Sequence, residues 1–156
     1  MREITVGGQR VVLDDDVAAI AEFVGVHVLV SQMRPNAPTL MFRPGQVTSV
    51  ILRRRNGYVV DHINGDTLDN RRENLQLLTQ SQNMMKKRCT THPGVTVRAS
   101  GRFRYKTLSG RYKVTRDLEE ARRGADASRR AMGIKGMPLN YPEVGEHYWD
   151  GRLRTE

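Results

Sequence analysis

Short apolar segments alternate with turn residues along the first part of the chain, a pattern typical of small sheets and short helices. It predicts three elements in order: a β-hairpin over residues 4–13, a helix over 17–24 and a strand over 26–30. Asp14 to Asp16 supply N-cap candidates and favourable charge at the start of that helix. Residues 47–52 fit a helix or a strand, and the turn-rich stretch 35–44 predicts no element.

In the middle of the chain two strands and a helix follow one another closely. The apolar pattern predicts strands over residues 58–60 and 75–78, with a loop between them. Thr79 and Gln82 then form a T-x-x-Q capping box, which starts a helix running to about residue 88. The order strand, loop, strand, helix is a compact ββα unit.

After Pro93 the pattern changes to hairpins. Three strands are predicted, over residues 94–98, 102–108 and 111–114. Ser109-Gly110 is a two-residue turn signal between the last two strands. A two-residue turn there pairs the strands so that four side chains pack on the following helix: Phe103, Tyr105, Tyr112 and Val114. The helix begins at Asp117 with Glu120 as its capping-box partner, and Gly133 ends it.

These elements predict an α+β protein. Its parts are an N-terminal β-rich segment, the ββα unit, and a three-stranded sheet packed on one helix. The boundary falls near Cys89–Pro93, which gives a domain over residues 1–90 and a second over 91–156. Both domains are small, so each buries only a thin core.

Composition limits the protein class. Of 156 residues, 38% are apolar and 28% are charged, an ordinary globular mixture. With a mean hydropathy of -0.58 and no run of 18 apolar residues, no membrane partner is expected. The first residues form no apolar leader, so we expect a cytoplasmic protein. The single cysteine, Cys89, excludes an intrachain disulfide framework and a zinc site built from paired cysteines.

The distribution of charge changes the picture. Residues 1–83 hold nine basic and nine acidic side chains, whereas residues 84–156 hold 17 and eight, so the whole net charge of +9 lies in the second half. The segment from Lys86 to Arg116 contains ten basic residues and no acidic one. Such a stretch repels itself unless a polyanion binds it with release of counterions. The charge therefore favours a nucleic acid as the partner.

Four polar residues of the ββα unit are candidates for chemistry: Asp61, His62, Asn74 and Asn83. Packing the helix on the hairpin would bring Asp61, His62 and Asn83 together. Carboxylate and amide oxygens suit one Mg²⁺ or Mn²⁺ ion. A neutral imidazole can take a proton from water near pH 7. Asn74 has no such chemistry, so we expect it to fix the loop that aims His62.

The stretch from Val60 to Leu75, with Asp61-His62, Ile63-Asn64-Gly65-Asp66 and Leu68 to Asn74, resembles the HNH endonucleases, most closely the homing or free-standing nicking enzymes of phages. The resemblance covers about residues 58–88. It implies that His62 is the general base, that Asp61 and Asn83 bind the metal, and that Asn74 holds the base. Because the third motif residue is Asn83 rather than histidine, the motif looks like the His-Asn-Asn variant. The element before the unit lacks the His-Arg pair that many relatives carry.

The second half resembles a different module. Gly94-Val95 at the start of a sheet, an alanine-rich helix and the segment 139–142 are similar to the plant ethylene-response-factor DNA-binding domain, over about residues 92–142. Alternation along 102–106 places three basic residues on one strand face, from which arginines could reach guanine edges and phosphates. We expect Arg111 and Lys113 to extend this face from the next strand. The residues expected to contact DNA are Arg98, Arg102, Arg104, Lys106, Arg111, Lys113, Lys86, Lys87 and Arg88.

Two functions follow from these observations. The first is a metal-dependent endonuclease of the homing or free-standing phage type, a nickase or a double-strand cutter, that hydrolyses double-stranded DNA without a small-molecule cofactor. If a phage encodes it, it acts in the cytoplasm of a bacterial host. The second is a sequence-specific DNA-binding regulator that keeps the nuclease fold without activity. The complete set of four motif residues favours the first, and charge alone leaves RNA binding open.

Overall fold

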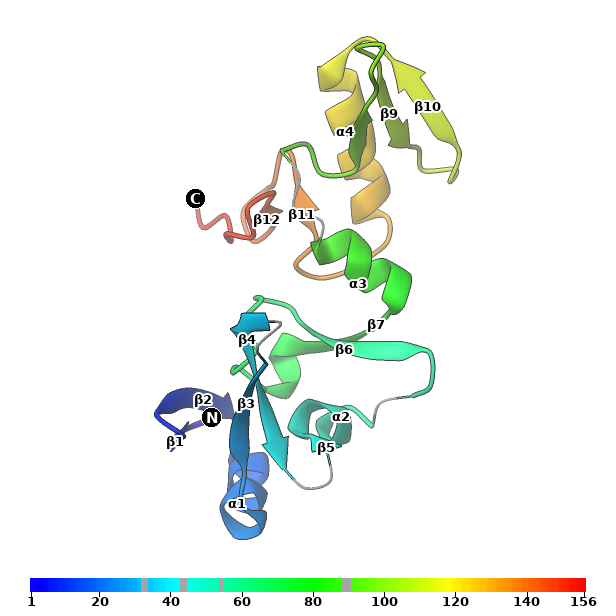
Figure 1. The fold of residues 1–156 in the computed structure, drawn as a ribbon. Coiled ribbons are helices and arrows are strands. Elements are labelled where there is room, and N and C mark those ends of the chain that lie inside the picture. The colour runs from blue at the N-terminus through cyan, green and yellow to red at the C-terminus, as the bar shows by residue number, and fades with distance from the viewer. Residues whose placement is uncertain (32–33, 43–44, 54, 88–90) are drawn as a thin grey trace. The chain divides into compact units, whose positions relative to one another are not determined.

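The structure is a computed structural model that describes the chain except for residues 32–33, 43–44, 54 and 88–90 (Figure 1). It consists of two compact units, Met1–Asn83 and Met84–Glu156. Both combine helices with small, mainly antiparallel sheets, which confirms the α+β class. No helix of the described ranges has the length and apolar character that crossing a membrane demands. The expected division into functional domains at residue 90 stays a prediction.

The N-terminal part of the first unit holds seven elements. They are β1 (Arg2–Val6), β2 (Gln9–Leu13), α1 (Asp15–Val24), β3 (His27–Ser31), β4 (Arg34–Phe42), β5 (Gly45–Gln46) and α2 (Val47–Ile51). The hairpin, the first helix and the strand after it lie where the sequence places them. The ambiguous segment near residue 47 is helical. Asp14 stands at the N-cap of α1 but makes no side-chain cap bond.

Strand β4 lies where the sequence pattern predicts no element, because two prolines interrupt it. Proline has no N–H to donate, so it is tolerated only where a strand lacks a neighbour on that side. In the sheet order β3-β4-β5, strand β5 pairs only with Met41 and Phe42. Pro35 and Pro38 therefore lie in a part of β4 that pairs with β3 alone within the described backbone.

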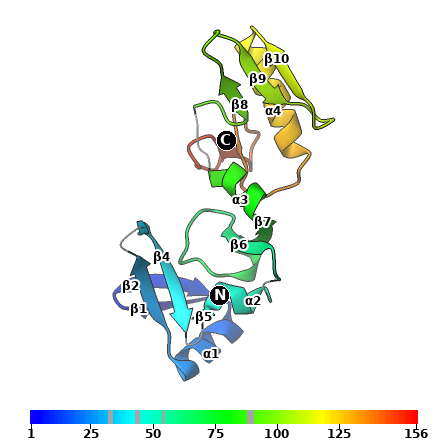
Figure 2. The ribbon, with the colours of Figure 1, turned by 45° about the vertical axis from the view of Figure 1, so that its right-hand side comes forward.

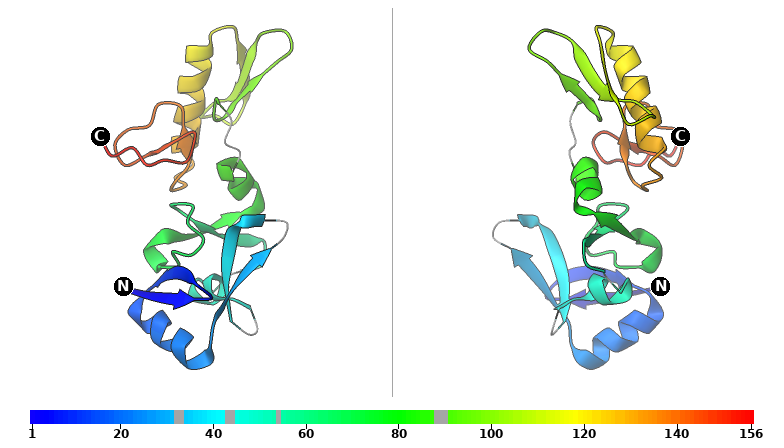
Figure 3. Two further views of the ribbon diagram at one scale, coloured as in Figure 1. Left: turned by 60° about the vertical axis from the view of Figure 1, so that its left-hand side comes forward. Right: turned by 90° about the vertical axis from the view of Figure 1, so that its right-hand side faces the viewer.

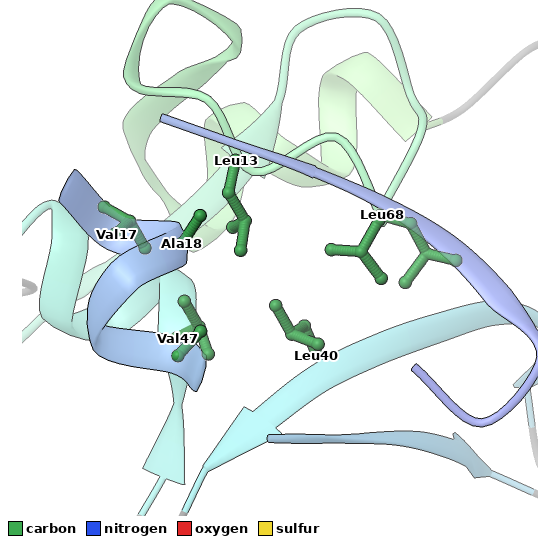
Figure 4. Close-up of a cluster of buried hydrophobic side chains, with 8 residues drawn as sticks. Leu13, Val17, Ala18, Leu40, Val47 and Leu68 are labelled. Carbon is green, nitrogen blue, oxygen red and sulfur yellow. The ribbon is translucent and has the colours of Figure 1, made fainter. Parts of the chain in front are cut away.

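One apolar cluster joins the N-terminal elements (Figure 4). Leu13 of β2, Ala18 of α1 and Leu40 of β4 are almost fully buried in it. Leu68, from the loop of the ββα unit, is buried in the same cluster. Burying a leucine side chain stabilises a fold by about 1.5–3 kcal/mol. The N-terminal elements and the ββα unit therefore share one core.

The ββα unit consists of β6 (Tyr58–His62), a 3₁₀ turn η1 (Arg72–Asn74), β7 (Leu75–Thr79) and α3 (Gln80–Lys87). Strands β6 and β7 pair antiparallel, with Asp61 opposite Gln76 and His62 opposite Leu75. The predicted capping box is confirmed: the Thr79 backbone N–H donates to Gln82 Oε1 at 2.8 Å, and the Gln82 N–H donates to Thr79 Oγ1 at 3.3 Å.

The second unit contains the three-stranded sheet β10-β9-β8, made of β8 (Val95–Val97), β9 (Phe103–Lys106) and β10 (Tyr112–Thr115), and helix α4 (Leu118–Arg130). Figures 2 and 3 show α4 running along one face of this sheet. Val95, Tyr105, Ala121 and Ala125 form its buried core. Two short strands, β11 (Pro138–Leu139) and β12 (His147–Tyr148), follow and pair parallel.

The turn between β9 and β10 corrects the predicted register. Its loop has three residues, since Gly110 N–H donates to Thr107 O at 2.9 Å and Thr107 N–H donates to Arg111 O at 2.8 Å. Gly110 has φ +81°, the left-handed conformation of a bulge after a type I turn. A shift of one residue turns every side chain of a strand to the opposite face. The two-residue turn predicted at Ser109-Gly110 is therefore wrong.

The new register exchanges the two faces of β10. Tyr112 and Val114, predicted against the helix, are 65% and 40% exposed on the opposite face. Lys113 takes the helix side, where its Nζ lies 2.6 Å from a carboxylate oxygen of Glu120. Lys113, together with Thr115 and Tyr105, lowers the pKa of Glu120 to about 2.

Helix α4 begins as predicted, but its capping box is incomplete. Asp117 accepts from the N–H groups of Glu119 at 2.8 Å and Glu120 at 3.2 Å. The Asp117 N–H donates instead to Thr115 Oγ1 at 3.1 Å, because the Glu120 side chain turns to the sheet. The cap is confirmed, and its reciprocal half is supplied by a different residue.

Candidate active site

His62 occupies the last position of β6 and is half-buried. Its Nε2 lies 3.2 Å from Oδ1 of Asn70. Burial lowers the pKa of His62, while the hydrogen bond to Asn70 and the charge of Asp61 oppose that shift. The neutral imidazole is therefore favoured, which is the form that can accept a proton.

Asn74 fastens the loop that connects β6 to β7. Its Oδ1 accepts from the backbone N–H of Asn64 at 3.0 Å, and its Nδ2 donates to Asn64 Oδ1 at 2.9 Å and to Asp69 O at 2.8 Å. The Asn74 carbonyl also accepts from Ile63 N–H at 2.8 Å. One amide thus ties both ends of the loop together, directly after His62.

Asn70 is the site residue to which the sequence analysis gave no role. It is completely buried, and its Oδ1 is the hydrogen-bond partner of the His62 ring. Its backbone N–H donates to Val12 O at 2.8 Å, and Val12 N–H donates to Leu68 O at 2.9 Å. Strand β2 therefore supports the loop that carries Asn70, which gives the N-terminal elements a structural connection to the site.

Charged side chains brace the outside of the same loop. Arg71 donates to both carboxylate oxygens of Asp69 at 2.8 Å, and this pair lowers the pKa of Asp69. Arg72 donates to Asp14 and Asp16 at the start of α1. The carboxylate of Asp14 that could have capped α1 is thus used to hold η1 instead.

Asp61 and Asn83, the two expected metal ligands, are both buried. Asp61 accepts from Gln76 Nε2 at 2.8 Å. Asn83, on α3, is 8% exposed, and its Oδ1 has no hydrogen-bond partner among the described residues. A buried carbonyl oxygen without a donor is costly unless something else satisfies it, and a hard cation does so. The donor set therefore fits Mg²⁺ or Mn²⁺.

Over the described residues, no group of three or more His, Cys, Asp and Glu side chains is arranged to hold a metal. A carboxylate and an amide oxygen are accordingly the candidate ligands. His62 is hydrogen-bonded to Asn70, and Asn74 is hydrogen-bonded to Asn64 and Asp69, so both groups of contacts belong to the loop between β6 and β7. Asp61 precedes His62 on β6 and acts on its ring by charge, and Asn83 lies on α3.

Residues 55–85 match the family model described as HNH endonuclease. The match includes all four motif residues, and it supports a nuclease that hydrolyses phosphodiester bonds and acts on DNA. HNH nucleases generally use a divalent metal ion. No curated protein and no solved structure matches the chain.

The expected DNA-contacting residues divide into groups. Arg98, Arg102 and Lys106 are exposed, and Arg104 is half-buried; registers place all four on the sheet face opposite α4. Arg111 is exposed opposite Thr107, and Lys113 is turned toward Glu120, so neither extends that face as predicted. The physical reason is the three-residue turn between β9 and β10.

The basic residues before the sheet differ from expectation as well. Lys86 is 9% exposed, so its side chain is buried in the second unit instead of standing on its surface. Lys87 ends α3, its side chain lies outside the described ones, and Arg88 lies outside the described residues. Among the expected DNA-contacting residues whose side chains the structure describes, Arg98, Arg102, Arg104 and Lys106 thus share one sheet face.

Proposed function

We propose that the protein is a metal-dependent HNH endonuclease that cuts double-stranded DNA, with His62 as its general base and Asp61 and Asn83 as ligands of one Mg²⁺ or Mn²⁺ ion. The observation that carries this proposal is the HNH match over residues 55–85, within which a half-buried His62 is held by a hydrogen bond. The His-Asn-Asn variant and a phage-type homing or nicking role belong to the same proposal.

The hydrogen bonds around His62 suit its imidazole ring to accept a proton. With Asn70 Oδ1 as acceptor, Nε2 carries the proton and Nδ1 is the basic nitrogen. Asn74 keeps the loop in place, so the ring does not have to be oriented anew in each turnover. A bound divalent ion would supply charge stabilisation for the phosphate and the leaving oxygen. Asp61 and Asn83 contribute only oxygen atoms to it.

DNA binding is assigned mainly to the second domain, residues 91–156, which resembles the ethylene-response-factor module. The three strands of its sheet lie in the segment from Lys86 to Arg116, which contains ten basic residues and no acidic one. Residues 1–83 have no net charge, so they contribute little counterion release. We therefore assign cleavage to residues 1–90 and most of the affinity to the sheet.

Plasmid cleavage tests this function. Supercoiled DNA should be nicked or linearised in Mg²⁺ or Mn²⁺ and left intact in EDTA, and the product form tells a single-strand from a double-strand cut. His62→Ala should lower the rate by about 10²–10⁴, the usual contribution of a positioned general base. Asp61→Ala should abolish turnover and leave DNA affinity largely unchanged. His27→Ala, an exposed histidine of β3, is the matched control and should cut like the wild type.

Three results would contradict the proposal. Full activity in EDTA would show that no metal ion is needed. A wild-type cleavage rate in His62→Ala would show that His62 is not the general base. Sequence-specific DNA binding without cleavage in either metal would favour the regulator with a degenerate nuclease fold.

A further inference from the structure

The outer face of the second unit's sheet is a small grid of side chains. Strand pairing puts Arg104 at its centre, opposite Thr96 on one side and Val114 on the other. The next row toward the hairpin end pairs Lys106 with Tyr112. Arg98 and Arg102 face each other across the other loop, where Arg98 N–H donates to Arg102 O at 2.9 Å. Arg104 is thus surrounded, whereas the other basic residues lie at the margins.

Arg104 differs from the other basic residues of this face in its contacts. Its guanidinium carbon lies 4.6 Å from the centre of the Tyr112 ring. Its Nε is buried and has no hydrogen-bond partner among the described residues. Arg98 and Arg102 are exposed. An aromatic ring therefore stacks on one arginine of the face, and the buried Nε of that arginine has no hydrogen-bond partner among the described residues.

Tyr112 has no evident role in the core. It is 65% exposed and lies on the face opposite α4, outside the buried cluster. A large aromatic side chain in that position contributes chiefly through its contact with the guanidinium, because planar arginine stacks well on a ring face.

We propose that Tyr112 is a positioning residue that holds the Arg104 guanidinium for bidentate hydrogen bonding to a guanine in the major groove of DNA. The inference rests on the proposed DNA-binding function and deepens it. Guanine presents two acceptors, O6 and N7, that match the fork of arginine. A fork held in advance loses less conformational freedom on binding than a mobile one does. The marginal residues Arg98, Arg102 and Lys106 then contact phosphates, which carry no sequence information.

The test is selection of bound sequences by the full chain from a pool of double-stranded DNA with a randomised segment, in EDTA so that no DNA is cut. The wild type should enrich guanine at a defined position. Arg104→Gln should reduce that preference by roughly 5- to 150-fold, the range of one bidentate base contact. Tyr112→Leu should reduce it by about 2- to 5-fold, and Tyr112→Phe, which keeps the ring, should retain it.

The controls separate positioning from folding and from general affinity. Tyr112→Leu should keep the wild-type thermal midpoint and the same salt dependence on unselected DNA, because phosphate contacts are unchanged. Arg102→Gln should keep the guanine preference and flatten the salt slope by about one unit.

Some outcomes overturn only this inference. They are a full guanine preference in Tyr112→Leu, a loss in Tyr112→Phe equal to that in Tyr112→Leu, or DNA binding by the wild type without any guanine preference. A wild-type chain that binds no DNA from the pool would overturn the proposed DNA-binding function itself, and the inference with it.

Discussion

His62 lies in surroundings that disfavour its charged form. Burial is the largest influence and lowers its pKa, while Asn70 and Asp61 act in the opposite direction without reversing the result. A lowered pKa keeps the ring neutral in mildly acidic solution, where a free histidine, with a pKa of about 6.5, is protonated. If His62 is the general base, as proposed, it is therefore present in its neutral, basic form over a wider pH range.

This shift predicts the acid limb of the pH profile. The rate of plasmid cleavage per unit of enzyme should begin to fall only below about pH 6.5, since the base remains neutral down to its lowered pKa. Asn70→Ala removes an interaction that raises this pKa, so its acid limb should move further down while its maximal rate falls. A limb centred above pH 6.5 in the wild type would contradict the assignment of His62. Measurements of kcat/KM from pH 5 to 8 decide the matter.

Asn70 also marks the limit of sequence analysis at the level of single residues. Residue types and their order in the ββα unit single out Asp61, His62, Asn74 and Asn83 as candidates. Asn70 acts through its contact with His62 and is held by the backbone of Val12, much earlier in the chain. No local pattern records a pairing between segments so distant, so this residue could not be singled out.

At the level of elements, the strands and helices followed the apolar pattern more reliably than their register did. The helix from Gln80 and the strands at β6 and β7 were predicted from local signals. The face of β10 was not, because one residue in the turn before it decides the register. Ser109-Gly110 fits a two-residue turn as well as a three-residue loop, and only pairing with β9 distinguishes them.

Gly124 gives a prediction at the same level. In most helices Gly→Ala is stabilising by about 1 kcal/mol. At Gly124 of α4 a Cβ atom would lie 2.1 Å from Cε2 of the buried Tyr105 ring. We expect Gly124→Ala to destabilise the second unit by about 1–3 kcal/mol, the usual effect of overpacking, as measured by urea unfolding.

A double mutant isolates the cause. In a Tyr105→Leu background the ring is absent, so Gly124→Ala should become neutral or stabilising. Equal destabilisation in both backgrounds would show that the close approach of ring and helix is not what requires glycine at this position.

For the whole chain, two divisions nearly coincide. Along the chain, the boundary between the compact units lies between Asn83 and Met84. The net charge is zero in residues 1–83 and +9 in residues 84–156. Composition alone located the charge division. The local pattern does not predict that the last residues of α3 belong to the second unit. They are held there by Arg129, a buried residue of α4, which donates to Met85 O at 3.1 Å and to Pro138 O at 2.9 Å.

The hydrogen bonds of Arg129 predict how the chain can be divided. A fragment of residues 79–156 keeps the capping box of α3 and the Met85 carbonyl, whereas a fragment of residues 91–156 lacks both. Loss of one acceptor from a buried guanidinium should lower the free energy of unfolding of the shorter fragment by about 1.5–3 kcal/mol. Both fragments keep the outer sheet face, so once folded they should bind DNA with the salt slope of the full chain and cut none of it. Urea unfolding measures the stability difference, and DNA titrations between about 50 and 200 mM salt measure the slope.

Two results would contradict this prediction. Equal stability of the two fragments would mean that Met85 contributes nothing to the second unit. A much shallower salt slope in both fragments would place a large share of the DNA contacts in residues 1–78.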